Sequence, residues 1–108
     1  MILINVRLAV RPEKSDEWAK IAAQYARDVT AEQGNVFFEW YRAAEDPNVW
    51  IAVEGFRDGA AGATHMGTAH VAEFIAVAPD YVAEQPTVIY IDAADHPGWV
   101  PMGEIQPR

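Results

Sequence analysis

Alternating hydrophobic and polar positions predict four β-strands in this chain. Over residues 2–10 every even position is aliphatic and the odd positions include Asn5 and Arg7, which is the two-residue period of a strand with one buried face. Residues 35–43 and 49–56 alternate around aromatic side chains, and the short turn at residues 44–48 makes them an antiparallel hairpin. A fourth strand is expected after Pro86, over residues 87–92.

Two helical segments separate these strands. Residues 15–33 place large apolar side chains at helical spacing, and Gly34 is expected to close this helix in the left-handed conformation. Residues 58–74 have the pattern of a broken helix, with Asp58 as its N-cap and Gly67-Thr68 interrupting and recapping it. His65 is therefore expected at a helix break, where backbone N–H groups lack partners within the helix.

The order strand, helix, strand, strand, helix, strand predicts a ferredoxin-like α+β fold, an antiparallel sheet with both helices on one face. Residues 1–92 form this domain, and residues 93–108 form an irregular tail whose Trp99 or Ile105 is expected to dock on a partner chain. Aromatic residues occupy both faces of the strand at 35–43. We therefore expect both faces of the sheet to be covered, one by the helices and one by another sheet.

Composition narrows the classes of function. A net charge of −8 over 108 residues argues against nucleic acid and anionic membranes, which need clustered Lys and Arg. The absence of cysteine excludes disulfides, thiolate nucleophiles and cysteine-ligated metal centres. Without an apolar run long enough for a membrane span or a basic leader, the expectation is a soluble, cytoplasmic protein.

Two residues are the candidates for acid–base chemistry. His65, with an ordinary pKa of about 6.5, can take and return a proton; alternatively it hydrogen-bonds a backbone carbonyl and fixes the helix break. Glu54 shares a strand face with Trp50 and Phe56, so that burial would raise its pKa. The alternative for Glu54 is an ion pair with Arg57 or another cation.

A second group of residues is interpreted as substrate-binding. Aromatic rings on the same side of the sheet can stack on a flat substrate, although they also suit a plain core; the group comprises Phe38, Trp40, Trp50, Phe56 and His70. His70 also fits a structural role. It follows His65 by five residues, about 140° around an ideal helix, so the two are expected to be poor ligands for a shared metal, and no metal site is predicted.

Three features of the sequence together resemble the antibiotic biosynthesis monooxygenase family, over about residues 2–92. They are Glu32-Gln-Gly34 before an aromatic strand, Glu54-Gly-Phe-Arg-Asp58 at the end of the third strand, and the spacing of His65, Thr68, His70 and Phe74. The resemblance implies a homodimeric α+β barrel in which two sheets pack face to face. Each subunit would have a pocket between its sheet and its helices. By strand parity, Asn5, Arg7 and Tyr41 would lie at the dimer interface.

The resemblance also implies a chemistry. Members similar to this chain oxidise electron-rich quinols or polycyclic phenols with molecular oxygen and without metal, flavin or haem. Such a reaction needs a group that favours the phenolate, a dry cavity and a proton donor for the peroxide. A haem-degrading branch shares the fold, but the positions of its asparagine, tryptophan and iron-binding histidine correspond here to Val6, His65 and Ile75, so no haem is expected.

Two other classes of function stay open from the sequence. One is an isomerase of a small oxygenated metabolite on the same scaffold, which would need a polar pocket. The other is a dimeric binding or stress-associated protein without catalysis. The aromatic strand faces favour the oxygenase over the isomerase.

Overall fold

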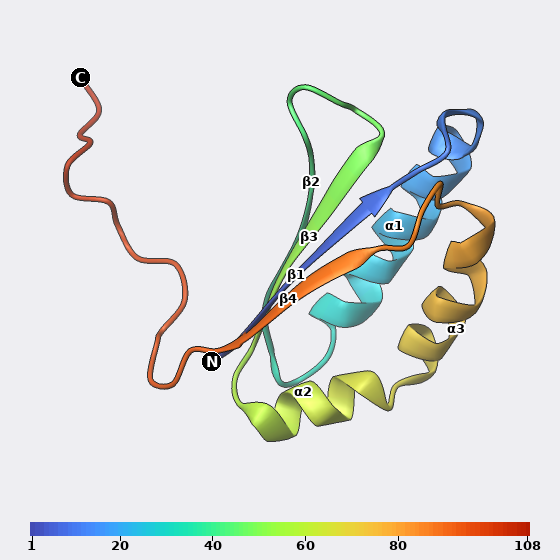
Figure 1. Ribbon diagram of the computed structural model, residues 1–108. Coiled ribbons are helices and arrows are strands. Elements are labelled where there is room, and N and C mark those ends of the chain that lie inside the picture. Colours follow the sequence, from blue (N-terminus) through green and yellow to red (C-terminus); the bar gives the residue numbers. More distant parts are fainter.

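The computed structural model describes all 108 residues, and its centre is a four-stranded antiparallel sheet with the helices on one face (Figure 1). The strands are β1 (Ile2–Ala9), β2 (Asn35–Arg42), β3 (Val49–Phe56) and β4 (Thr87–Asp92). Their order in the sheet is β2-β3-β1-β4, so β4 is an edge strand beside the central β1. The predicted α+β ferredoxin-like fold is confirmed.

The helices are α1 (Ser15–Thr30), α2 (Gly59–Met66) and α3 (Ala69–Val77), with short 3-10 turns η1 (Pro12–Lys14) and η2 (Ala78–Asp80). The predicted helix break separates α2 from α3. Asp58 caps α2 by accepting a hydrogen bond from the Ala61 N–H at 2.8 Å, and Thr68 caps α3 by accepting from the Val71 N–H. Gly67 is the C-cap of α2 and Thr68 is the N-cap of α3, so one helix ends and the next begins at these two residues.

The role predicted for Gly34 is wrong. Helix α1 ends at Thr30, its C-cap Ala31 is right-handed, and Gly34 does not have a positive φ. A Cβ at position 34 would lie only 2.4 Å from the Cβ of Ala61. Glycine is needed because the turn after α1 passes directly against α2.

Strand register sorts the side chains by face. Ile4 pairs with Glu54 on one side and with Tyr90 on the other, and Glu54 pairs with Phe38. Paired residues share a face, so these four side chains all point toward the helices. A bulge between Asn35 and Phe37 comes before Phe38. From Phe38 onward, the side chains of β2 therefore alternate between the two faces of the sheet as predicted.

The other face of the sheet has no second layer within the chain (Figure 1). Ile89 and Ile91 of β4 lie on it and are exposed. Trp99 from the tail packs against Phe37 at a ring-centroid distance of 5.7 Å, yet 70% of its surface remains exposed. A partner for this face stays a prediction.

The two ends of the folded domain lie side by side. The amino group of Met1 donates to the carbonyl of Ala93 at 3.1 Å, and the Ala93 N–H donates to the carbonyl of Met1 at 2.9 Å. After Trp99, which contacts Phe37, the tail runs away from the sheet (Figure 1). None of the helices has the length and apolar character that a membrane crossing would need.

Candidate active site

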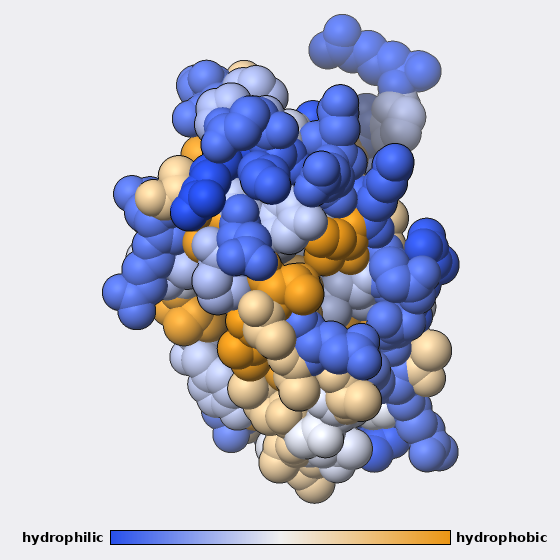
Figure 2. All heavy atoms as spheres, turned by 90° about the vertical axis from the view of Figure 1, so that its right-hand side faces the viewer, coloured by the Kyte–Doolittle hydropathy of each residue, from blue (hydrophilic) through white to orange (hydrophobic).

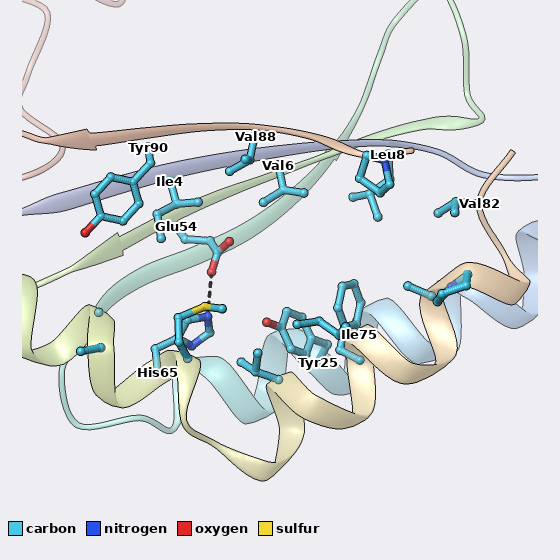
Figure 3. A pocket seen from close by; sticks show the side chains of 18 of the residues that line it. Ile4, Val6, Leu8, Tyr25, Glu54, His65, Ile75, Val82, Val88 and Tyr90 are labelled. Atoms are coloured by element: carbon cyan, nitrogen blue, oxygen red, sulfur yellow. Dashed lines mark ion pairs between the residues drawn. The ribbon is translucent and has the colours of Figure 1, made fainter. Parts of the chain in front are cut away.

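A cavity of about 710 Å³ lies between the sheet and the helices. Figure 3 shows its two walls: Ile4, Val6, Leu8, Val88 and Tyr90 hang from the sheet, and His65, Tyr25 and Ile75 rise from the helices. The lining includes four ionisable side chains and no Lys or Arg; the four are Tyr25, Glu54, His65 and Tyr90. The cavity is therefore an apolar space with one acidic region.

The mouth of the cavity carries large apolar side chains that are exposed. Met66 and Ile75 come from the helical side and Val88 and Tyr90 from the edge strand β4. Hydrophobic residues are visible between hydrophilic ones on the side of the molecule that bears α3 (Figure 2). A ligand that enters here meets apolar surface first.

Glu54 is a buried acid in an apolar setting, as predicted. Only 4% of the residue is exposed, and burial, followed by the negative charge of Glu32, raises its pKa to about 7. Its Oε1 atom is buried without a hydrogen-bond partner. The alternative ion pair with Arg57 is wrong, because Arg57 contacts the exposed Asp58 at 3.5 Å; the group at ion-pair distance from Glu54 is His65, at 3.6 Å.

His65 lies between two carboxyl groups. Its Nδ1 is 2.7 Å from Oε2 of Glu32, and its Nε2 is 3.6 Å from Oε1 of Glu54 (Figure 3 marks the second contact). The ring packs on Phe56 at a centroid distance of 4.5 Å. The expected bond from the ring to a backbone carbonyl is wrong, since the ring binds Glu32; it is the carbonyl of His65 that accepts, from the Thr68 hydroxyl at 2.7 Å.

His70 approaches the same carboxylate although the ideal-helix argument kept it apart from His65. Its Nε2 is 2.7 Å from Oε2 of Glu32. The argument fails because the helix breaks at Gly67-Thr68, so the rotation of 100° per residue does not continue from α2 into α3. His70 does not line the cavity, and its ring centroid is 6.4 Å from that of His65.

Glu32, His65 and His70 offer a donor set that metals such as zinc bind, with the ligand atoms within 4.8 Å of one another. The oxygen, however, is 2.7 Å from each nitrogen. Ligand atoms around a tetrahedral zinc ion are roughly 3.3 Å apart, given bonds near 2.0 to 2.1 Å. The arrangement is that of two hydrogen bonds to one oxygen.

The aromatic residues predicted to bind substrate do not line the cavity. Trp18 of α1 packs edge-on against Trp40 and Trp50, and Tyr25 packs edge-on against Phe38. Helix α1 covers the β2–β3 half of the sheet, where the Trp40 indole N–H donates to the carbonyl of Ala22 at 2.9 Å. Phe38, Trp50 and Phe56 are core residues, and Trp40 is partly buried against them. Phe56 contacts the ring of His65, and Phe38 contacts the ring of Tyr25.

The cavity instead uses residues that the sequence pattern did not single out. Val88 and Tyr90 face the cavity because they pair with Val6 and Ile4. The alternation of side chains along the strands is the feature of the sequence that could have identified them. Tyr25 resembled an ordinary core position of α1. Burial, followed by the charges of Glu54 and Glu32, raises the pKa of its hydroxyl, so Tyr25 is a neutral hydrogen-bond donor in the cavity.

The family model described as antibiotic biosynthesis monooxygenase matches residues 1–77. The chain belongs to the antibiotic biosynthesis monooxygenase family. Over 95 residues it is 25% identical to the Bacillus subtilis protein named "Putative monooxygenase YcnE", which covers 88% of this chain and the whole of that protein. This match and the family model include both Glu54 and His65.

Solved structures share the fold of this family member. A Deinococcus radiodurans protein that bears the same family description superposes with a TM-score of 0.83 at 15% identity, covering 94% of this chain and 100% of that one. Rv0793 from Mycobacterium tuberculosis superposes with a TM-score of 0.81 at 18% identity, covering 89% of this chain and 97% of that one. At these identities the likeness concerns the fold alone.

Proposed function

We propose that the protein is a cofactor-independent monooxygenase that oxidises a neutral hydroxylated aromatic compound, a quinol or polycyclic phenol, with molecular oxygen. The observation that carries this proposal is the Glu54–His65 contact of 3.6 Å in an otherwise apolar cavity. An apolar cavity favours the oxygenase over an isomerase of a small polar metabolite, which would need several polar groups to hold its substrate.

The size and charge of the cavity support an aromatic substrate of several rings. A cavity of about 150 Å³ holds one benzene molecule, whereas this cavity has about 710 Å³. The lining has no Lys or Arg that could balance a carboxylate or phosphate on the substrate. An anionic substrate would in addition meet a protein of net charge −8.

The proposed reaction balances without an added reductant. A phenol or hydroquinone with a hydrogen on a ring carbon ortho or para to a hydroxyl reacts with one O₂ to give the corresponding quinone and one H₂O. One oxygen atom enters the ring and the other leaves as water, and the substrate supplies all four electrons. The phenolate first transfers an electron to O₂, and the two radicals combine into a carbon-bound peroxide. Loss of the C–H proton then breaks the O–O bond.

Proton transfer is the part of this reaction that the chain itself can perform. With its Nδ1 occupied by Glu32, His65 presents Nε2 toward Glu54 and the cavity. Together they can accept the phenolic proton and return it to the peroxide. Because the pKa of Glu54 is raised to about 7, the acid and base forms of this carboxyl coexist near neutral pH. The apolar walls exclude water that would otherwise protonate these intermediates.

Oxygen uptake by a panel of neutral hydroquinones and polycyclic phenols tests the proposal, measured against spontaneous autoxidation with the protein kept in a chelator. We expect uptake above the blank, and a loss on the order of a hundredfold in His65→Ala, since positioned acid–base groups contribute about 10² to 10⁴. His96→Ala, in the exposed tail, is the matched control and should keep full activity.

Thermal unfolding of both variants separates catalysis from folding. An unchanged rate in His65→Ala with a lowered Tm would make this histidine structural. No uptake above the blank for any compound of the panel would favour the binding protein without catalysis.

A further inference from the structure

Glu32 is the one residue in the site that contacts both histidines, and the reaction described above does not use it directly. It lies in the turn after α1, and its side chain is only 11% exposed. Oε2 is 2.7 Å from Nδ1 of His65 and 2.7 Å from Nε2 of His70. A single buried oxygen therefore ties α2 and α3 to the end of α1.

With Glu32 ionised, the chemistry of these two contacts fixes where the protons are. An ionised carboxylate accepts hydrogen bonds and cannot donate them. Both nitrogens must therefore carry a hydrogen, Nδ1 in His65 and Nε2 in His70. In neutral His65 this leaves Nε2 as the unprotonated nitrogen, and Nε2 is the atom that faces Glu54.

We propose that Glu32 is a positioning residue that holds His65 in the Nδ1–H tautomer with Nε2 directed at Glu54 and the cavity, while His70 holds Glu32 in place as its second donor. This inference rests on the proposed function, in which Nε2 exchanges the proton of the substrate. The tautomer matters because an Nε2–H imidazole would present a hydrogen where the reaction needs a lone pair.

Packing around the ring supports a positioning role. Phe56 lies against the His65 ring at 4.5 Å with an angle of 35° between the planes, so the ring cannot swing freely. Glu32 itself is held close because Gly34 lets the turn approach Ala61. The ionisable groups that face or flank His65 are Glu32 from the turn, Glu54 from β3, His70 from α3 and Tyr25 from α1.

The third histidine provides an internal reference for the test. The Gly98 N–H donates to Nδ1 of His96 at 3.1 Å, so neutral His96 carries its hydrogen on Nε2. The chain has only three histidines, and nitrogen-15 NMR that correlates ring nitrogens with ring protons reports the tautomer of each. In the wild type, at a pH where the rings are neutral, we expect Nδ1–H for His65 and Nε2–H for His70 and His96.

Substitution of Glu32 gives the second arm. Glu32→Leu keeps the size of the side chain but removes the acceptor, so His65 should become a mixture of tautomers and kcat should fall on the order of a hundredfold with KM little changed. Glu32→Gln keeps one acceptor oxygen and should recover part of the loss. Glu13→Gln, an exposed carboxyl, is the matched control and should change neither kcat nor the spectra.

The outcomes are decisive even where a variant does not fold. An Nε2–H or doubly protonated His65 in the wild type at that pH overturns the proposal without any variant. An unchanged tautomer and kcat in folded Glu32→Leu also overturns it. Absence of oxygen uptake in the wild type removes the proposed function instead, and the tautomers then decide only whether Glu32 orients the ring.

Discussion

Glu54 illustrates how a single position on a strand acquires an unusual acidity. Its neighbours across the sheet are Ile4 and Phe38, and Nε2 of His65 lies 3.6 Å from its Oε1. Water is excluded from the carboxyl, so the charged form loses solvation that its surroundings only partly replace. The Glu54 carboxyl therefore gains or loses its proton in the neutral pH range.

The free energy of unfolding should depend on pH because of the raised pKa of Glu54. Burial raises the pKa of Glu54 from its ordinary value of 4.5 to about 7, so between these pH values the folded state binds more protons than the unfolded state. The free energy of unfolding contributed by Glu54 is then fully present below pH 4.5, decreases as pH rises, and is lost above pH 7. The shift corresponds to about 3 kcal/mol at most.

Urea unfolding of the wild type and Glu54→Gln at about pH 5 and about pH 8 measures this effect. The variant should gain stability relative to the wild type at the higher pH, because an amide has no charge to bury. Glu13→Gln should show no such pH-dependent difference. Parallel stability curves for Glu54→Gln and the wild type would mean that the carboxyl is solvated in the folded protein.

Single residues could be predicted when a local period governs them. Strand alternation placed Glu54 among apolar neighbours, and helix-cap chemistry placed His65 at a break. The partner of His65 could not be predicted in this way, because Glu32 lies 33 residues earlier and meets it only through the packing of the turn on α2. No short-range pattern contains that contact.

At the scale of elements, the turn between α1 and β2 and the break between α2 and α3 work as a pair. The turn presents Glu32, and the break presents His65 and His70 from two helix ends. The space between turn and helix is set by Gly34, where any side chain would collide with Ala61. The geometry of the site therefore depends on a glycine that has no chemical role.

Gly34→Ala should accordingly disturb both folding and the site. The added Cβ would lie 2.4 Å from the Cβ of Ala61, so the turn must move away from α2, at a cost of about 1 to 3 kcal/mol. The signals of His65 and His70 should shift with it, because Glu32 moves with the turn. Denaturant unfolding and the histidine NMR spectrum are the measurements.

Gly59→Ala is the control for that substitution. Gly59 is the first residue of α2, and a Cβ there meets nothing within 4 Å. Gly59 lines the cavity, but a Cβ there does not contact the side chain of Ala61. Alanine should therefore leave the contacts of Glu32 with both histidines unchanged and raise stability by up to about 1 kcal/mol through its helix propensity. Equal behaviour of the two variants would show that the turn is not held against α2.

The sequence predicted the identity of these elements better than their ends. Apolar periodicity identified all four strands and the long helix, but α1 stops at Thr30 rather than at residue 33, and β1 at Ala9 rather than at residue 10. Both differences come from tertiary contacts. Gly34 packs closely against Ala61 and does not form a left-handed helix cap. Val10 does not continue the pairing with β3 but forms an isolated bridge with Val82.

At the scale of the whole molecule, one face of the sheet has helices and the other has none (Figure 1). Asn5 has a buried side-chain oxygen without a partner on this open face, and Ile89 and Ile91 are exposed there. A sheet with two apolar faces is more stable when both are covered. We propose that a second copy of the chain covers it.

Sedimentation equilibrium at micromolar concentration should show a dimer. Ile89→Glu, which places a charge on the open face, should shift the protein to monomer, because the interface would then bury an unpaired charge. Val77→Glu places the same charge on α3, away from that face, and should leave the dimer intact. A monomeric wild type would contradict the proposal, and a dimer that survives Ile89→Glu would place its interface elsewhere.

The position of the two ends of the domain suits the protein to circular permutation. Met1 exchanges two backbone hydrogen bonds with Ala93, which directly follows the domain of residues 1–92, so the two ends of the ferredoxin-like domain are already neighbours. A short linker between them would close the backbone without stretching it, and new ends could be opened in the exposed turn between β2 and β3, far along the chain from Glu32 and His65. With the ends joined before the start of β1, a circularly permuted chain would keep every contact of the site.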